Sequence, residues 1–245
     1  MRGIARIVLD RPPLNVLDIP ASRALAAALD RAGKDRNVRV IVLSGKGRCF
    51  SAGVDIADHT KARVKGMLAA FHAAVRALHR LEKPTIAAIH GHCLGGGMEL
   101  ALACDFALAE RGAVLGLPEI RLACYPPVAA VLLPRRVGAL RANELLLLGD
   151  AIPAPKALEM GLLNAVVPAH GLDKAVNALA ARLMSRSGSA LACAKAAIRA
   201  GESPAFGKAL NAIERLYLRR LAKTADMEEG VRAFLAKRPP RWRHA

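Results

Sequence analysis

The chain has 245 residues, of which 53% are hydrophobic and 3% aromatic, and its formal net charge is +17 at pH 7. This length and apolar content fit one large globular α/β fold and exclude a disordered protein. No apolar run is long enough for a membrane span, and the amino terminus lacks the apolar core of a secretory signal, so we expect a cytoplasmic protein with no membrane partner. The charge alone does not distinguish a polyanionic partner or phosphorylated ligand from a compositional habit of an Arg-rich proteome.

The first part of the chain alternates strand and helix patterns. Two short β-branched runs, Ile4–Leu9 and Val38–Leu43, flank a stretch with helical spacing, Ala21–Arg31, which predicts a βαβ unit and a parallel sheet. Further along we expect a long helix at residues 61–81, a strand at Thr85–Ile89, a short helix at Met98–Cys104 and a strand at Asp105–Ala109.

Beyond Pro126 the strand signal fades and helical patterns dominate. The predicted helices are Ala139–Leu148, Ala154–Met160, Leu172–Met184, Ser189–Ala200, Phe206–Thr224 and Met227–Lys237. We therefore expect a mixed α/β core at residues 1–190. A helical region at residues 191–245 should pack on that core or on a neighbouring subunit.

A glycine turn, Gly95-Gly96-Gly97, joins a predicted strand to a predicted helix. Glycine permits positive φ and close approach of a ligand, and the first amides of a helix attract negative charge. A second glycine-containing turn, Ala52-Gly53-Val54-Asp55, follows another strand of the same predicted sheet. Amides from both turns can converge on one carbonyl oxygen as an oxyanion hole, which, without a nearby nucleophile, serves enolate formation from a thioester.

Two glutamates are candidates for the proton transfers that such chemistry needs. Glu99 lies within the first turn of the predicted helix, and Glu119 lies in the segment Leu117-Pro118-Glu119-Ile120. Two carboxylates in unequal surroundings can divide acid and base roles. Taken alone, Glu99 is more simply a residue that complements the helix dipole and Glu119 a solvated loop residue. Sequence spacing does not show that they meet.

Four motifs in this order closely resemble the signatures of the crotonase, or enoyl-CoA hydratase/isomerase, superfamily: Phe50–Ile56, Ala88–Leu100, Cys104-Asp105 and Leu117–Ile120. The resemblance covers essentially the whole chain, from residue 9 to residue 242. It implies an α/β crotonase (ClpP-like) spiral of ββα repeats with a helical C-terminal trimerisation region. It also implies a homotrimer or homohexamer without a metal or a tightly bound cofactor, in which coenzyme A enters as part of an acyl-CoA substrate.

The resemblance assigns roles to particular residues. The amides of Val54 and Gly96 form the oxyanion hole, and Glu99 and Glu119 match the two glutamates with which hydratases activate a water. The coenzyme A positions are Arg48, Ala52, Asp55, Ile56, Phe234 and Lys237. We therefore expect an enoyl-CoA hydratase, a lyase, and an isomerase that uses one glutamate is the alternative.

The acyl pocket departs from the common hydratase pattern. Where many members have a glycine-rich segment after the second glutamate, this chain has Tyr125-Pro126-Pro127, and adjacent prolines fix φ and remove amide donors. The segment resembles cyclohexa-1,5-diene-1-carbonyl-CoA hydratases, which implies a cyclic dienoyl-CoA substrate. We expect His59, Tyr125 and Pro127 to line the pocket.

Other features have plainer explanations. His72 and His79 lie two helical turns apart, and His90 alternates with His92, but no carboxylate or cysteine completes a metal site, so we interpret them as structural. The five cysteines contain no C-x-x-C pair and are expected to be free. Some crotonase relatives bind RNA, which makes RNA binding a second hypothesis for this basic chain. The lack of aromatic platforms and RNA motifs disfavours a nucleic-acid partner.

Overall fold

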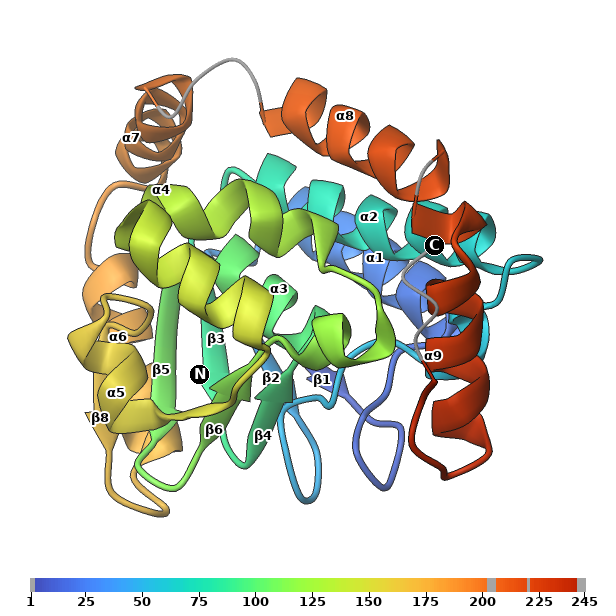
Figure 1. Ribbon diagram of the computed structural model, residues 1–245. Coiled ribbons are helices and arrows are strands. Elements are labelled where there is room, and N and C mark those ends of the chain that lie inside the picture. Colours follow the sequence, from blue (N-terminus) through green and yellow to red (C-terminus); the bar gives the residue numbers. More distant parts are fainter. Residues whose placement is uncertain (1–2, 202–205, 220, 242–245) are drawn as a thin grey trace.

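The computed structural model describes residues 3–201, 206–219 and 221–241 (Figure 1). A main sheet of parallel strands has the order β1-β2-β3-β5-β8, and a smaller sheet has the order β4-β6-β7. The strands of the main sheet are β1 (Ile4–Leu9), β2 (Val40–Gly45), β3 (Thr85–Ile89), β5 (Phe106–Glu110) and β8 (Ala165–Val167). Those of the smaller sheet are β4 (His92–Leu94), β6 (Val114–Gly116) and β7 (Ile152–Pro153), with β7 antiparallel to β6.

Helices surround both sheets. The α-helices are α1 (Ile19–Lys34), α2 (Val64–Arg80), α3 (Gly96–Ala103), α4 (Pro127–Asn143), α5 (Ala154–Glu159), α6 (Leu172–Met184), α7 (Gly188–Gly201), α8 (Phe206–Arg219) and α9 (Ala225–Leu235). Shorter helical turns are η1 (Ile56–His59), η2 (Pro118–Leu122), η3 (Glu144–Leu148) and η4 (Leu221–Lys223). None of the helices in the described ranges is both long and apolar enough to cross a membrane.

The central strands are apolar on both faces because helices cover both sides of the main sheet. In β2, Val40 and Val42 pack with the apolar side of α6, whereas Ile41 and Leu43 face the larger core built with α1, α2, α3 and α4. A strand buried on both faces reads as a continuous apolar run, which is why the parallel sheet was predictable from the sequence.

The C-terminal helices return to the region where the glycine turns lie. Helix α8 packs against α4 and α2, and α9 packs against η1 and η2. The α9–η2 contact is close, because a Cβ at Gly230 would lie 2.4 Å from the Leu122 carbonyl oxygen. Helix α7 contributes Lys195, whose ammonium binds Asp105 and the Lys83 carbonyl oxygen. Because α7 begins at Gly188, the predicted division at residue 190 falls inside this helix, and the division itself stays a prediction.

Two sequence expectations about the elements are wrong. Helix α4 begins at Pro127 rather than near Ala139, because proline fits the first turn of a helix, where its missing N–H has no intrahelical acceptor. The predicted helix 139–148 instead covers the end of α4, beyond a break at Gly138 (φ 77°), together with η3. Strand β8 was missed because its three residues are too few to show a periodic pattern.

The strands β4, β6 and β7 of the smaller sheet were also not predicted, whereas most other predicted helices and strands lie within a few residues of their expected bounds. The parallel sheet and the helical C-terminal region are confirmed. The predicted helix 206–224 includes residue 220, which lies outside the described residues. The resemblance to the crotonase superfamily extends to residue 242, which also lies outside them. Four of the five cysteines are buried and all five are free thiols.

Candidate active site

The two glycine turns lie against each other although about forty residues separate them in the sequence. The Ser51 amide donates to the His92 carbonyl at 3.0 Å, and the Leu94 amide donates to the Ser51 carbonyl at 2.9 Å. A Cβ at Gly53 would lie 3.0 Å from the Leu94 oxygen and 3.4 Å from the Gly96 nitrogen. The segment that contains Val54 is therefore held beside the start of α3.

Val54 and Gly96 both line the cavity that opens at this junction. The Leu17 amide donates to the Gly53 carbonyl oxygen, and the Asp55 amide donates to the Leu17 carbonyl oxygen. Because the Gly53 carbonyl and the Val54 N–H point in opposite directions across their shared peptide bond, the Val54 N–H points away from Leu17. Gly96 is the first residue of α3, and its N–H has no acceptor one turn earlier in the helix. Within the described part of the chain, neither amide donates a backbone hydrogen bond. The pair can therefore donate hydrogen bonds to the oxygen of a bound carbonyl group.

Glu99 projects from α3 into the cavity and is held by the first turn of α4. Its side chain is 3% exposed, and Oε1 accepts hydrogen bonds from the amides of Val128 (2.7 Å) and Ala129 (2.9 Å). Pro127 offers no N–H, so the two amides that follow it make the contact. Burial raises the pKa of Glu99, and the two amide bonds oppose that rise because they stabilise the carboxylate.

Glu119 reaches the same cavity from η2. Its Oε1 lies close to Gly95, because a Cβ added to Gly95 would stand 2.6 Å from this oxygen. Its Oε2 is shielded from solvent and has no hydrogen-bond partner among the described residues. Burial, together with the negative charge of Glu99, raises the pKa of Glu119 to about 8. The solvated loop position suggested for Glu119 alone is therefore wrong. At neutral pH Glu119 holds a proton and can act as an acid, while Glu99 is placed to act as a base.

The proton on Glu119 should affect how the free energy of unfolding depends on pH. The pKa of Glu119 rises from 4.5 to about 8 on folding, so between these values the folded state binds more protons than the unfolded state. Stability contributed by this group is present below pH 4.5 and is lost as pH rises towards 8. We expect the Glu119→Gln variant to lose less stability between about pH 5 and 8 than the parent, by on the order of 3 kcal/mol.

Urea unfolding at the two pH values measures the difference. Glu82→Gln, at an exposed glutamate, is the matched control and should follow the parent protein. An identical pH dependence in the parent and in Glu119→Gln would mean that the folded state does not retain this proton.

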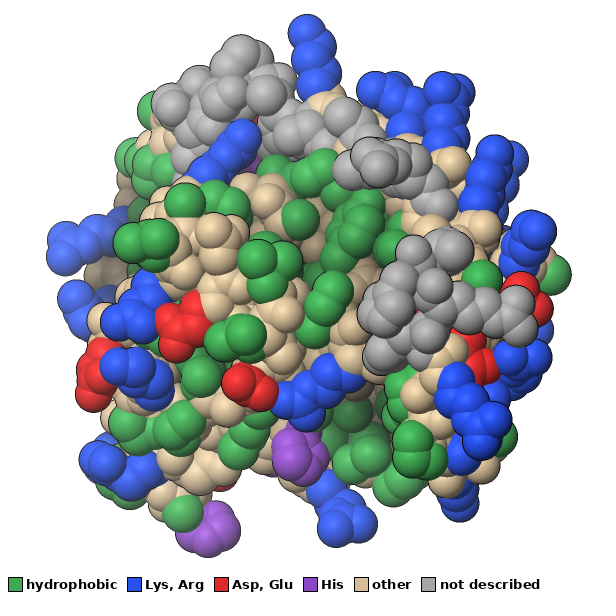
Figure 2. Space-filling model, viewed as in Figure 1, with side chains coloured by type: hydrophobic (Ala, Val, Ile, Leu, Met, Phe, Trp, Pro, Cys, Tyr) green, Lys and Arg blue, Asp and Glu red, His purple; other side chains and the backbone are tan. Residues whose placement is uncertain are grey.

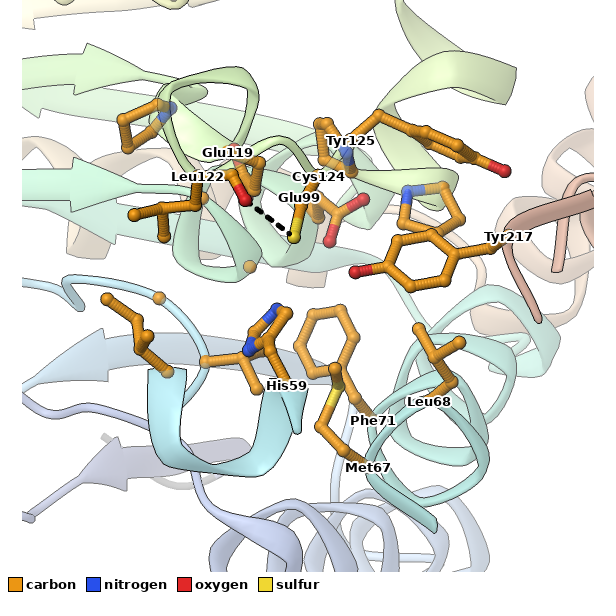
Figure 3. A pocket seen from close by; sticks show the side chains of 18 of the residues that line it. His59, Met67, Leu68, Phe71, Glu99, Glu119, Leu122, Cys124, Tyr125 and Tyr217 are labelled. Atoms are coloured by element: carbon orange, nitrogen blue, oxygen red, sulfur yellow. Dashed lines mark hydrogen bonds between the residues drawn. The ribbon is translucent and has the colours of Figure 1, made fainter. Parts of the chain in front are cut away.

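The cavity itself has an apolar wall opposite the two carboxylates (Figure 3). Its lining includes these residues expected from the sequence: Ala52, Val54, Ile56, His59, Gly96, Glu99, Glu119, Tyr125 and Pro127. It also includes residues that the sequence did not single out as site residues: Met67, Leu68, Phe71, His72, Leu122, Cys124 and Tyr217. In Figure 3, Met67, Leu68 and Phe71 of α2 face Glu99, Glu119 and Cys124 across the cavity.

Four predicted coenzyme A positions lie outside this lining. Arg48 is exposed in the loop after β2, and the Asp55 side chain accepts a hydrogen bond from the Ala57 amide at the start of η1. Phe234, at the end of α9, is 52% exposed, and Lys237 is also exposed. Helix α9, which ends at Leu235, packs against η1, which begins at Ile56.

Two of the predicted pocket residues use their polar atoms on the protein itself. The Tyr125 hydroxyl donates to the Ile213 carbonyl of α8 at 2.9 Å, so Tyr125 presents its ring to the cavity. His59 Nδ1 lies 3.0 Å from the Asp55 carbonyl oxygen, and burial lowers the pKa of His59. His59 is therefore neutral at physiological pH and donates from Nδ1.

His72 and Tyr217 are the polar lining residues that sequence reasoning missed. His72 was interpreted as structural, and Tyr217 was not singled out. One signal was available: Glu214 and Tyr217 are three residues apart on a predicted helix and so share a face. That face turns inwards, because the His72 Nδ1 atom lies 3.1 Å from Glu214 Oε2.

Comparison with known proteins gives a consistent result. The family model described as "Enoyl-CoA hydratase/isomerase" matches residues 1–245. The chain is 36% identical to a probable enoyl-CoA hydratase of Bacillus subtilis, over 98% of this chain and 95% of that one. It is 34% identical to the cyclohexa-1,5-dienecarbonyl-CoA hydratase of Thauera aromatica, over 98% of this chain and 93% of the other.

Solved structures agree with this assignment. The crystal structure of an enoyl-CoA hydratase from Mycobacterium avium subsp. paratuberculosis superposes with a TM-score of 0.88 at 33% identity, over 98% of this chain and 95% of that chain. The predicted crotonase fold and the prediction of an enoyl-CoA hydratase-type enzyme are confirmed. The chain therefore belongs to the enoyl-CoA hydratase/isomerase family.

Proposed function

We propose that this protein is an acyl-CoA hydratase that adds water to the double bond conjugated to a coenzyme A thioester. One observation carries the proposal: Glu99 and Glu119, from different elements, lie in one cavity beside the amides of Val54 and Gly96. A double-bond isomerase needs only one group to move a proton between two carbons. Hydration needs a second group that handles the water, and this cavity contains a carboxylate for each task.

In this mechanism the thioester oxygen accepts hydrogen bonds from Val54 and Gly96, which stabilise the enolate as it forms. Each such donor is typically worth roughly 2.7–4 kcal/mol in the transition state. Glu99 takes a proton from water while the water oxygen bonds to the β-carbon of the acyl group. Glu119, whose pKa is raised to about 8, gives its proton to the α-carbon. A proton passes from Glu99 to Glu119 to complete the cycle.

The coenzyme A moiety is proposed to leave the cavity past Ala52, Asp55 and Ile56. Its phosphates would meet Arg48, and its outer end would meet Phe234 and Lys237 near α9. The packing of α9 against η1, which begins at Ile56, supports the part of this path between Ile56 and the end of α9. No other cofactor is needed for this reaction.

Assembly into trimers or paired trimers is also proposed. Exposed apolar side chains gather over α4, η3 and α5 (Figure 2), and they include Leu140 (86% exposed), Leu147 (65%), Leu148 (59%) and Leu158 (39%). Such a patch is typical of a surface that another subunit covers. Light scattering of the purified protein tests this, and a monomer at micromolar concentration would contradict it.

A cyclic dienoyl group is the first candidate for the acyl group. The relative from Thauera aromatica is named for a cyclohexadiene thioester. In this chain Tyr125, Pro126 and Pro127 form part of the cavity lining. Proline rings are rigid and present a flat apolar surface, which suits a ring better than a long flexible chain.

Turnover in heavy-oxygen water tests the reaction. The protein is incubated with straight-chain enoyl-CoA and cyclic dienoyl-CoA thioesters, and the masses of the products are measured by mass spectrometry. We expect a hydroxyacyl product that carries one oxygen atom from the solvent. A product of unchanged mass with a moved double bond would assign the protein to the isomerases, and no conversion of any thioester would overturn the proposal.

A further inference from the structure

Two buried polar atoms in the acyl cavity have no role in hydration as proposed. Tyr217 is 1% exposed and His72 is fully buried, and both line the cavity. Neither Tyr217 Oη nor His72 Nε2 has a hydrogen-bond partner among the described residues. A buried polar atom without a partner costs free energy, so a site that retains two of them is expected to bind something that satisfies them.

The orientation of His72 is set by a neighbouring carboxylate. Its Nδ1 lies 3.1 Å from Glu214 Oε2, and Arg76 lies 3.3 Å from the same oxygen. The hydrogen bond from His72 lowers the pKa of Glu214, so Glu214 is ionised and Nδ1 carries the donated proton. The other ring nitrogen, Nε2, is left to pair with a ligand in the cavity.

Tyr217 offers the complementary group. Burial raises the pKa of Tyr217, so its hydroxyl keeps its proton and can donate at neutral pH. The Cys124 thiol lies beside it, but a thiol is a weak acceptor and this one donates to the Leu122 carbonyl at 3.4 Å. In Figure 3 the Tyr217 hydroxyl points into the cavity towards Glu99 and Phe71.

The hydrogen-bonding groups of the cavity exceed what a hydrocarbon enoyl thioester can use. Its carbonyl oxygen pairs with the amides of Val54 and Gly96, and the reacting water pairs with Glu99 and Glu119. The hydroxyl of Tyr217 and the Nε2 atom of His72 remain. A hydroxyl group can pair with either of them, because it both accepts and donates hydrogen bonds.

We propose that Tyr217 and His72 form a polar subsite and that the natural acyl group carries a hydroxyl group on a ring or chain, beyond the carbon that receives the water. This inference rests on the proposed hydratase function, because it assumes that an acyl thioester occupies this cavity. It adds a hydroxyl group to the acyl groups considered above. Sites built to bind a hydroxyl group discriminate strongly against analogues that lack it, because their own polar groups are then left unpaired.

Binding of saturated thioesters tests the subsite without any turnover. Calorimetry compares cyclohexanecarbonyl-CoA with its ring-hydroxylated isomers, and hexanoyl-CoA with its 4-, 5- and 6-hydroxy derivatives. At least one hydroxylated compound should bind about ten-fold or more tightly than its hydrocarbon counterpart. The matching keto compound should show a smaller gain, since it can accept from Tyr217 but has no hydrogen bond to donate.

Variants assign the preference to the two residues. Tyr217→Phe should reduce the preference for the hydroxyl group about five-fold, because one hydrogen bond is lost. His72→Asn keeps an amide N–H in the position of Nδ1 for Glu214 but removes Nε2, and should have a similar effect. Tyr125→Phe is the matched control: its hydroxyl is bound to Ile213, so its loss should leave the ratio of the two affinities unchanged. Thermal unfolding checks that each variant is folded.

The outcomes separate this inference from the proposed function. Equal affinities for hydroxylated and hydrocarbon thioesters at every tested position would overturn the polar subsite, even if hydration is observed. So would a hydroxyl preference that Tyr217→Phe leaves intact in a folded variant. A hydroxyl preference in binding without incorporation of solvent oxygen would instead overturn the hydratase proposal and support the subsite.

Discussion

Replacing Glu99 or Glu119 by glutamine should lower the kcat for hydration by about 10²–10⁴-fold. Each substitution keeps the size of the side chain and removes the group that exchanges a proton. At position 99 the amide oxygen of glutamine can still accept from Val128 and Ala129, so the side chain keeps its place while its basicity is lost. At position 119 the glutamine amide is too weak an acid to protonate the enolate. The loss therefore reports proton transfer rather than a collapsed site.

Steady-state kinetics with the best thioester of the panel gives kcat, and calorimetry with a saturated thioester gives the affinity. We expect the affinity to change little in either variant, because the amides of Val54 and Gly96 still bind the carbonyl oxygen. Glu82→Gln, on the surface, controls for the loss of a negative charge. Turnover close to that of the parent in both single variants would contradict the assigned roles.

Gly96→Ala should lower kcat/KM by about 10²–10³-fold through displacement of an oxyanion donor. A Cβ at this position would stand 2.7 Å from Val54 Cγ2 and 3.1 Å from Phe71 Cζ. Real Cβ atoms essentially never stand as close as 2.7 Å to a neighbour, so the start of α3 and the Val54 side chain must move apart. Their two amides then no longer meet at one oxygen. Preorganised donors lose most of their value when their geometry is disturbed.

A second substitution separates this geometric effect from a general loss of stability. Val54→Ala removes Cγ2 but keeps the amide of residue 54, so the double variant Val54→Ala/Gly96→Ala should recover a large part of the lost kcat/KM. Phe71 still requires a small adjustment, so recovery should be incomplete. If the double variant is as slow as Gly96→Ala alone, or if Gly96→Ala retains full activity, the two amides do not form the proposed oxyanion hole.

The sequence predicted the features that depend on neighbouring residues along the chain. The apolar runs of β2 and β3 indicated a sheet covered on both sides, and the Gly95-Gly96-Gly97 turn followed by Glu99 marked a strand–helix junction. The start of α4 was missed, since consecutive prolines suggest a loop unless the first turn of a helix follows them.

Two properties of the candidate site needed contacts that only the folded chain makes. Glu99 is bound by the amides of Val128 and Ala129, about thirty residues further on. The pKa of Glu119 depends on its burial and on its distance from Glu99, and neither is encoded by the segment around Glu119.

His72 and Tyr217, the two residues of the proposed polar subsite, show most clearly what the sequence determines and what the tertiary structure adds. The sequence placed a histidine on one predicted helix and a tyrosine on another, and it marked neither as a site residue. The tertiary structure brings α2 and α8 together, pairs His72 with Glu214 and leaves two polar atoms facing one cavity. The sequence by itself determined the local elements, the family signatures and the residue types available for chemistry. The tertiary structure decided which of them share a cavity, because burial and pKa shifts arise from contacts between distant segments.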